Sequence, residues 1–256
     1  MDISFYTAGV GAKAQQSKLD VIGNNMANVN TTAYKSQSAG FVDLLYSNIR
    51  DSADKDSQLK VGSGTRLDKT DSNFNNGGVQ PTDNPTDYTI VGSGFFAVQN
   101  PATNEIYYTR DGSFQHSLRN DGEFYLVTAN GELVLDKNLE RIKVDLPGKE
   151  DTKDTKGTKD TNNAKAAEEV QKPGVFDFKI KDGMLLQGDN LFSPTAKNGA
   201  PILKEDAQLQ SGYLELSNVE VSNEMVKLIE TQRAYSMSLK MVQTSNEIEE
   251  VINNLR

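Results

Sequence analysis

Histidine and cysteine side chains could provide nucleophiles, proton transfer or metal ligands, and this sequence has almost none of them. His116 is the only histidine among 256 residues, and cysteine is absent. A multi-histidine metal site is therefore excluded, as are thiolate chemistry, disulfide bonds and Cys-based metal sites. A lone histidine in a polar segment is most often simply solvated, and we expect this of His116.

Carboxylate groups are abundant, but their positions indicate turns. Asp111, Asp121, Asp182 and Asp189 each lie beside a glycine, where turn formation explains them better than metal binding. No apolar pocket is implied around any pair of carboxylates, so none is expected to serve in acid–base catalysis. Gly92-Ser93-Gly94 precedes a strand-like run and lacks a third glycine, so it does not fit a dinucleotide-binding loop. We expect no enzyme activity, no cofactor, no metal site and no small-molecule substrate.

Composition limits the class of protein further. The net charge of −9 argues against nucleic acid as a partner, because phosphate backbones are bound by clustered Lys and Arg. The hydrophobic content of 36% is low for a compact enzyme, which suggests that other subunits complete part of the buried surface. No apolar run approaches the roughly 18 residues of a membrane span. Residues 1–30 lack the basic start and apolar centre of a cleavable signal peptide, so any export is expected to use another route.

Residues 212–256 are predicted to form one long helix. Seven side chains recur in alternating steps of four and three, which is the pattern of a coiled-coil seam; they are Val221, Met225, Leu228, Gln232, Tyr235, Leu239 and Val242. The step changes near Ser245, which rotates the apolar stripe. A long helix with one narrow stripe requires a partner.

Residues 1–35 show the same pattern. The alternation of four and three runs without a break through Ala8, Ala12, Gln15, Leu19, Ile22, Met26 and Val29. The helix is predicted to end near Asn28, where residues that compete for backbone hydrogen bonds become dense. Its first half is rich in Gly and Ala, so it could approach another helix closely.

The middle of the chain is predicted to be a β domain. Residues 36–87 read as a short amphipathic segment followed by a polar, extended connector that could carry one or two short strands. In residues 88–211 the hydrophobic period changes to two, and Asn-Gly and Asp-Gly pairs separate the runs, as in hairpins. Residues 149–172 alternate Lys, Asp and Thr and are predicted to be a flexible charged insertion. The fold class is therefore α+β, with the terminal helices forming a coiled-coil pair around a central all-β domain and a connector.

Three separated blocks resemble the flagellar rod and hook protein family. Residues 19–35 (LDVIGNNMANVNTTAYK) are similar to its N-terminal signature. Residues 212–219 (GYLELSNV) and 224–235 (EMVKLIETQRAY) are similar to its C-terminal signature, and 92–98 (GSGFFAV) and 108–114 (YTRDGSF) to blocks in its middle. Ala33 departs from the family pattern, which usually has a glycine there, so its backbone is expected to be less free to take a positive φ.

The resemblance implies a mechanical function. Residues 42–50 (VDLLYSNIR) are most similar to distal rod proteins, with a proximal rod protein or a hook-type subunit as the alternatives. The chain would then be a structural subunit of the bacterial flagellar basal body, exported by the flagellar type III apparatus without a cleaved signal. Its partners would be copies of itself and neighbouring rod and hook proteins, in a hollow helical tube that transmits torque and surrounds the export channel.

Candidate assembly residues come from both terminal segments. Apolar side chains of the stripes would hold neighbouring helices together, and polar ones would fix their register through hydrogen bonds across subunits. The candidates are Leu19, Ile22, Asn24, Asn25, Met26, Asn28, Met225, Leu228, Gln232, Arg233, Tyr235 and Leu239. Simple capping and solvation is the alternative interpretation of the polar members.

Two other classes of protein remain to be weighed. A secreted β-sheet adhesin or binding module would account for the β domain and leave both terminal stripes without a role. An enzyme that acts on cell-wall polymer would need a pair of carboxylates in a cleft. The assembly hypothesis accounts for more of the sequence than either.

Overall fold

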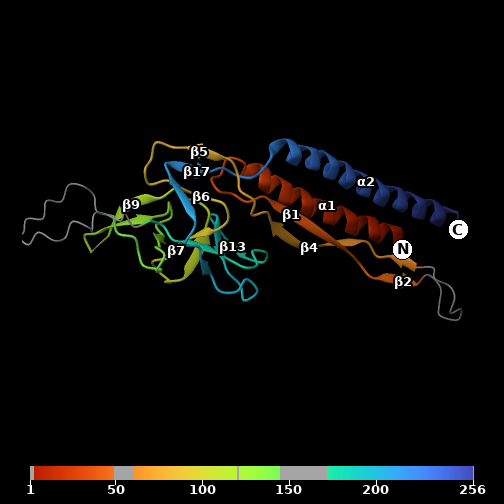
Figure 1. The fold of residues 1–256 in the computed structure, drawn as a ribbon. Coiled ribbons are helices and arrows are strands. Elements are labelled where there is room, and N and C mark those ends of the chain that lie inside the picture. Colours follow the sequence, from red (N-terminus) through yellow and green to blue (C-terminus); the bar gives the residue numbers. More distant parts are fainter. Residues whose placement is uncertain (1–2, 49–59, 120, 145–171, 256) are drawn as a thin grey trace, which may run out of the picture. The chain divides into compact units, whose positions relative to one another are not determined.

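The computed structural model describes residues 3–48, 60–119, 121–144 and 172–255 (Figure 1). The chain divides into two compact units. Unit 1 comprises Met1–Thr31, Lys35–Phe74 and Ser217–Arg256, and unit 2 comprises Thr32–Tyr34 and Asn75–Leu216. The charged insertion predicted at 149–172 lies outside the described residues, except for Lys172.

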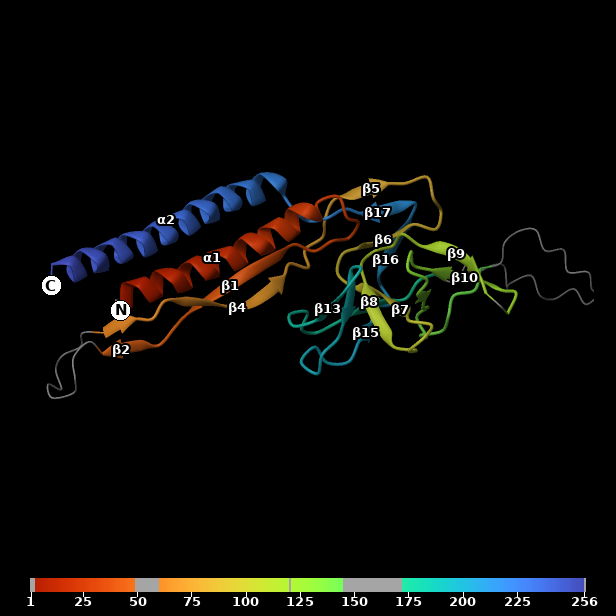
Figure 2. The same ribbon diagram turned by 180° about the vertical axis from the view of Figure 1, so that it is seen from behind.

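Unit 1 contains both helices. Helix α1 spans Ile3–Ala27 and helix α2 spans Val221–Asn254. The strands of this unit are β1 (Gln37–Asp43), β2 (Tyr46–Asn48), β3 (Lys60–Gly62) and β4 (Thr65–Ser72). β1 pairs antiparallel with β4 and β2 with β3, so these strands form a long hairpin. α1 packs against α2 and against β1 and β4, and the two helices run side by side in both views (Figures 1 and 2).

Unit 2 is built of strands throughout its described part. They are β5 (Val79–Pro81), β6 (Tyr88–Val91), β7 (Phe95–Gln99), β8 (Ile106–Thr109), β9 (Gln115–Leu118), β10 (Phe124–Val127), β11 (Leu133–Val134), β12 (Val175–Asp177), β13 (Leu185–Gly188), β14 (Leu191–Ser193), β15 (Ile202–Leu203), β16 (Gln208–Ser211) and β17 (Tyr213–Glu215). One sheet has the order β13-β14-β8-β7-β11-β10-β9, and β12 pairs with β7 and β15. β16 pairs with β6, and β17 with β5.

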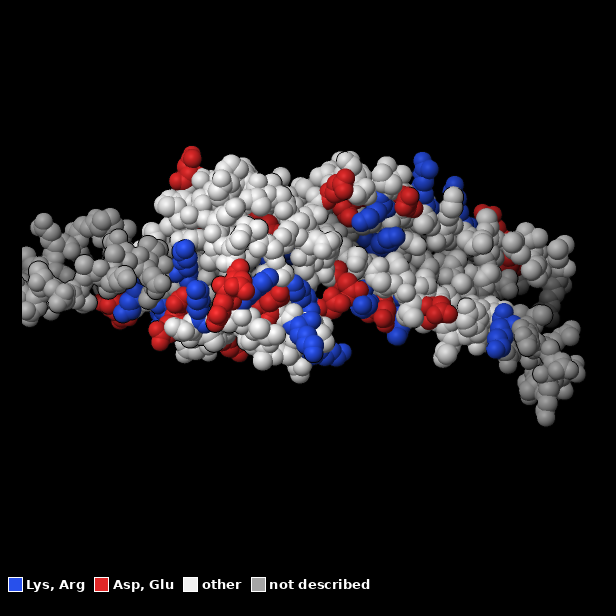
Figure 3. All heavy atoms as spheres, viewed as in Figure 1, with Lys and Arg blue, Asp and Glu red and all other residues white. Residues whose placement is uncertain are grey.

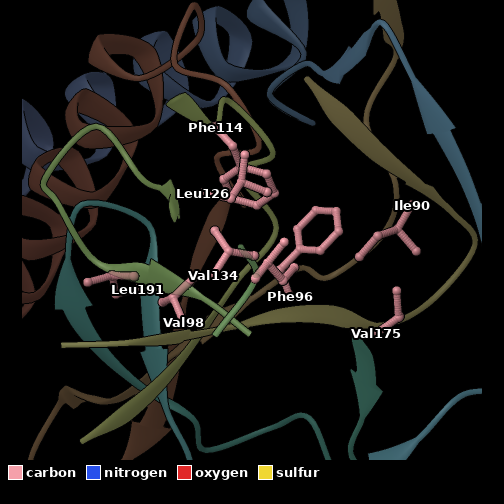
Figure 4. Close-up of a cluster of buried hydrophobic side chains, with 9 residues drawn as sticks. Ile90, Phe96, Val98, Phe114, Leu126, Val134, Val175 and Leu191 are labelled. Atoms are coloured by element: carbon pink, nitrogen blue, oxygen red, sulfur yellow. The ribbon is translucent and has the colours of Figure 1, made fainter. Parts of the chain in front are cut away.

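The core of unit 2 follows from the alternation of apolar residues in these strands. Its main cluster comprises Ile90, Phe96, Val98, Phe114, Leu126, Val134, Ile142, Val175 and Leu191 (Figure 4). The rings of Phe96 and Phe114 meet edge to face with centroids 5.2 Å apart, a favoured aromatic geometry. This core holds together the strands of unit 2 around Arg110.

The turn glycines confirm part of the hairpin prediction. Gly122, Gly131 and Gly183 have positive φ, as the Asp-Gly and Asn-Gly pairs predict. Gly112 is required for a different reason. A Cβ atom there would lie 1.7 Å from the carbonyl oxygen of Tyr88, so only glycine permits this close approach of two backbone segments.

Two predicted boundaries differ from the structure. α2 begins at Val221, and Tyr213–Glu215, placed in the helix by the sequence pattern, form strand β17. The segment 36–50 and the connector contain strands β1 to β5, where the sequence suggested only one or two. Both errors have the same cause, since these strands gain their stability from pairing with segments distant in the chain. The broader α+β arrangement, with helices at both ends of a mostly β chain, is confirmed.

Candidate functional site

The described residues hold no arrangement that suggests catalysis. Among them no group of three or more His, Asp and Glu could hold a metal ion. His116 lies exposed on β9, and the Asp111 carboxylate accepts a hydrogen bond from the Ser113 backbone, as in a turn. No described helix is long and apolar enough to cross a membrane. On the face shown in Figure 3, acidic and basic side chains lie among one another.

The contact between α1 and α2 is fixed by a buried polar group. Asn25, only 1% exposed, donates from Nδ2 to the Gln37 carbonyl (2.8 Å) and to Glu224 Oε2 (3.3 Å). Its Oδ1 accepts from the Gln37 backbone N–H at 2.9 Å. Lys227 donates to Glu224 Oε1 at 2.7 Å, which balances a carboxylate only 4% exposed. One asparagine therefore joins both helices to strand β1.

A second asparagine ties the segment before α2 to the hairpin of unit 1. Asn218 Oδ1 accepts from the Ser36 backbone N–H, and its Nδ2 donates to the Asn73 carbonyl, both at 2.7 Å. Ser36 and Asn73 are themselves linked by a backbone hydrogen bond of 2.8 Å. Asn218 thus connects the start of α2 to both ends of the hairpin at once. Sequence reasoning did not single it out, although it lies within the GYLELSNV block.

The other asparagines of the N-terminal signature make local contacts. Asn28 Nδ2 donates to the carbonyl and to Oδ1 of Asn24, at 2.9 and 2.7 Å, at the end of α1. Thr31 Oγ1 donates to Asn28 Oδ1 at 3.1 Å. These bonds satisfy groups at the helix terminus, which is a capping role.

The apolar candidates divide into contact residues and exposed residues. Ile22 is buried, and Leu19, Met26, Leu228 and Tyr235 are partly buried. Met225, Gln232, Arg233 and Leu239 are exposed. The reason is that α2 turns Glu224 and Thr231 inward, 4% and 2% exposed, so the side of α2 buried within the chain is rotated from the predicted stripe.

Unit 2 has a buried ion pair that sequence reasoning also missed. Arg110 Nε donates to Glu215 Oε2 at 2.9 Å, and both side chains are 3% exposed. The Arg110 guanidinium also donates to the carbonyls of Gly92 and Gly94 and to Asn76 Oδ1. Glu215 Oε1 accepts from the Gly77 N–H at 2.9 Å.

This ion pair connects three of the sequence blocks. Arg110 belongs to YTRDGSF, Gly92 and Gly94 to GSGFFAV, and Glu215 to GYLELSNV. Three of the segments that carry the family resemblance therefore meet in unit 2. The sequence offered one indication of this ion pair, the Tyr-Thr-Arg-Asp run. Arg110 follows a strand directly, and a charged residue in that position often has a partner.

Two carboxyl groups of unit 2 have shifted pKa values. Burial raises the pKa of Glu132, and the Thr128 hydroxyl that donates to it only partly offsets this. The pKa of Asp177 is lowered: burial acts to raise it, but hydrogen bonds from Ser93, Phe178 and Lys181 outweigh that effect. Neither group has the convergent partners of a catalytic acid or base, so both shifts concern stability.

Comparison with known families decides the identity. Residues 5–35 match the family described as flagella basal body rod protein, and residues 210–255 match the flagellar basal body rod FlgEFG protein C-terminal family. Residues 89–160 match the flagellar hook protein FlgE/F/G D1 domain. A flagellar basal-body rod protein FlgG from Borreliella burgdorferi is 34% identical over 99% of this chain and 98% of its own length. The chain belongs to the flagellar basal-body rod protein family.

Two further relatives are similar to the chain over nearly its whole length. FlgG from Buchnera aphidicola (subsp. Acyrthosiphon pisum) is 33% identical over 98% of this chain and 99% of its own length. The flagellar hook-basal body complex protein FlhP of Bacillus subtilis is 28% identical, with 99% of each chain covered. FlgG proteins are distal rod proteins, so the predicted distal-rod type is confirmed.

Proposed function

We propose that this rod subunit assembles with copies of itself into a hollow helical tube through the helices of unit 1. The proposal rests on the exposure of apolar side chains on α2. It packs on α1 along one side, yet Met225, Ile229, Met237 and Met241 are between 49% and 70% exposed on its other sides. Apolar patches of this kind mark protein–protein contacts, and a heterologous contact that does not close produces a filament.

The α1–α2 pair would act as the coiled-coil part of the subunit. Leu19, Ile22, Met26, Leu228 and Tyr235 would hold the two helices together, and Asn25 would set their register through Glu224. Buried polar residues at single positions specify register in coiled coils at some cost in stability. Of the remaining candidates, Met225, Leu239, Gln232 and Arg233 would contact neighbouring subunits, and Asn24 and Asn28 would end α1 correctly for that contact.

The wider setting follows from the family. The neighbours along the axis would be other rod and hook proteins, and the tube would transmit torque and surround an export channel. The chain would reach this extracytoplasmic site through the flagellar type III apparatus, without a cleaved signal peptide. Support comes from the family matches at both ends of the chain and from the exposed apolar side chains of α2.

Leu228→Asp tests the assembly role. A carboxylate placed in the α1–α2 contact lacks a partner there and costs several kcal/mol if it remains buried. We expect loss of assembly, measured by sedimentation and electron microscopy, and loss of swimming in a strain that depends on this variant. The strands of unit 2 should remain folded by circular dichroism.

Val226→Asp is the matched control. Val226 is 54% exposed and lies two residues from both Glu224 and Leu228, about 160° around α2 from the α1 contact, so the same charge should leave assembly intact. If Leu228→Asp still builds rods and restores swimming, the assembly role of this contact is wrong.

A further inference from the structure

Three Asn-Gly pairs of unit 2 share one chemical liability. They are Asn76-Gly77, Asn130-Gly131 and Asn198-Gly199. In such a pair the backbone nitrogen of the glycine can attack the Cγ atom of the asparagine, because glycine lacks the side chain that would crowd this approach. The sequence alone makes the three pairs equivalent, whereas their surroundings in the fold differ.

The reaction releases ammonia and takes up water. The glycine N–H loses its proton, the nitrogen forms a bond to Cγ, and the side-chain amide nitrogen takes up a proton and leaves as ammonia. Water then opens the resulting succinimide ring at one of its two carbonyl carbons, which gives aspartate or isoaspartate. Two conditions follow for a folded chain: the asparagine side chain must be free to turn toward the nitrogen, and the glycine N–H must be free to lose its proton.

Asn198 does not meet the first condition. The residue is 1% exposed, and its Oδ1 accepts hydrogen bonds from the backbone N–H and the Oγ1 hydroxyl of Thr195, at 2.7 and 2.6 Å. Its Nδ2 donates to the Ile180 carbonyl at 2.7 Å. Turning this side chain would break all three bonds inside the fold and leave their partners buried without replacements.

Asn76 does not meet the second condition. The Gly77 N–H donates to Glu215 Oε1 at 2.9 Å, and the Glu215 carboxylate is 3% exposed. Removal of the proton from this N–H would place a second negative charge against a buried carboxylate, which is unfavourable. The Arg110 guanidinium also donates to Asn76 Oδ1 at 2.7 Å and so holds the side chain in place.

Asn130 meets both conditions. Its side chain is exposed and makes no hydrogen bond with any described residue. It lies at the tip of the β10–β11 hairpin, in a loop closed by a bond of 2.9 Å from the Thr128 N–H to the Glu132 carbonyl. The Gly131 N–H donates to the neutral Thr128 carbonyl at 2.9 Å, and its φ of +88° is typical of three-residue hairpin loops. A bond at a hairpin tip opens more often than one in a core.

The products of this reaction would be unfavourable where they form. Asn130 lines a cavity of about 30 Å³ together with Asp111, Glu132 and Asp189. Burial, and then the nearby Asp189 carboxylate, already raise the pKa of Glu132, and a carboxylate at position 130 adds a further like charge. Isoaspartate also carries the main chain through its side-chain carbons, which lengthens the loop and shifts the pairing of Thr128 with Glu132.

We propose that Asn130 is a site of spontaneous deamidation in the folded protein, and that its conversion to aspartate or isoaspartate loosens the β10–β11 hairpin. The co-reactant is water alone. The inference is independent of the proposed assembly, because the site lies in unit 2 and the assembly surface in unit 1. The converted fraction then grows with the age of a subunit.

Peptide mapping by mass spectrometry tests the site. The full chain is incubated in mildly basic buffer, once folded and once in denaturant, and the converted fraction is measured at each Asn-Gly pair over time. In the folded chain we expect Asn130 to react about tenfold or more faster than Asn76 and Asn198, because only the hairpin tip opens readily. In denaturant the three rates should converge, since the surroundings that distinguish the pairs are lost.

Asn130→Gln is the matched control for the effect on the hairpin. Glutamine would need a six-membered ring, which closes far more slowly, and the free side chain of Asn130 means that the replacement breaks no contact. The melting temperature of the parent should fall during incubation in step with the converted fraction at position 130. The melting temperature of Asn130→Gln should stay constant over the same period.

Three results would overturn the inference. One is reaction of Asn76 or Asn198 in the folded chain as fast as Asn130. Another is the absence of conversion at Asn130 in the folded chain over a period in which the denatured chain reacts. The third is an unchanged melting temperature in a parent sample that is largely converted at Asn130, which would show that the hairpin is not loosened.

Discussion

At the scale of single residues, the buried Glu132 carboxyl destabilises unit 2 when it is charged. Burial raises its pKa above the usual 4.5, so the folded state holds the proton more tightly than the unfolded state does. The penalty is fully present above the folded-state pKa and disappears as the pH falls below 4.5, where both states are protonated. We expect Glu132→Gln to melt at a higher temperature than the parent at pH 7, with the difference closing toward pH 4.

The matched control is Glu140→Gln, which removes the same charge from an exposed position. Its melting temperature should follow that of the parent at both pH values. Equal stabilisation by both variants would show that the effect is one of net charge and that burial of Glu132 plays no part.

Individual side chains also show the limits of sequence reasoning. Ala33 occupies the place of a family glycine, and its φ is nevertheless +56°, a conformation that costs a non-glycine residue about 1–2 kcal/mol. Its backbone N–H donates to the Glu215 carbonyl at 2.8 Å and the residue is 1% exposed, so tertiary contacts hold it there. Spacing placed Asn25 on a helix, but its partner Glu224 is 199 residues away, and no local pattern shows that pairing.

At the scale of elements, the Arg110–Glu215 pair joins β17 to the rest of unit 2. Arg110→Met leaves a carboxylate buried without its cation, which typically costs about 3–5 kcal/mol. We expect the free energy of unfolding to fall by that amount when denaturant unfolding is followed by circular dichroism. The double variant Arg110→Met, Glu215→Leu should recover part of it, because no unpaired charge remains, although the Gly77 N–H and the Gly92 carbonyl lose their partners.

Arg141→Met provides the comparison for this element. Arg141 is exposed and its Nε donates to Gln99 at 3.2 Å. Its replacement should change stability by only about 0.5 kcal/mol. A loss at Arg110 no larger than at Arg141 would rule out a structural role for the ion pair.

Helices and strands could be predicted where the residues of the element itself carry a hydrophobic pattern. The alternation of apolar residues placed β6, β7, β8 and β10 correctly, and the dense run of Asn and Thr predicted the end of α1 within one residue. β9 and β16 are mostly polar (Gln-His-Ser-Leu and Gln-Leu-Gln-Ser), so no period marks them. The inward side of α2 was missed because it includes Glu224 and Thr231, which are buried through specific polar partners.

At the scale of the whole molecule, the division into units differs from the predicted β domain at 88–211. Unit 2 comprises Asn75–Leu216 together with the short segment Thr32–Tyr34. The added ends contain β5, β17 and both Asn76 and Glu215, the partners of Arg110. We expect a fragment of residues 75–216 to fold cooperatively on its own, as judged by thermal unfolding and dispersed amide NMR signals.

A fragment of residues 88–211 should be less stable by about 3 kcal/mol or more, because it buries the Arg110 cation without its carboxylate. The two fragments share the same core cluster, so a difference in their stability measures the contribution of residues 75–87 and 212–216. If the two fragments unfold with equal stability, the domain boundaries at 88 and 211 that the sequence pattern predicted are the correct ones.

The joining of α1 and α2 by Asn25 and Glu224 also orders events in time. The ribosome makes these two residues 199 positions apart, with the whole of unit 2 between them. α1 therefore lacks its helical partner while the middle of the chain is synthesised, and the α1–α2 contact is completed only after α2 emerges. A chain still on the ribosome thus lacks the helix pair through which we propose that the subunit assembles.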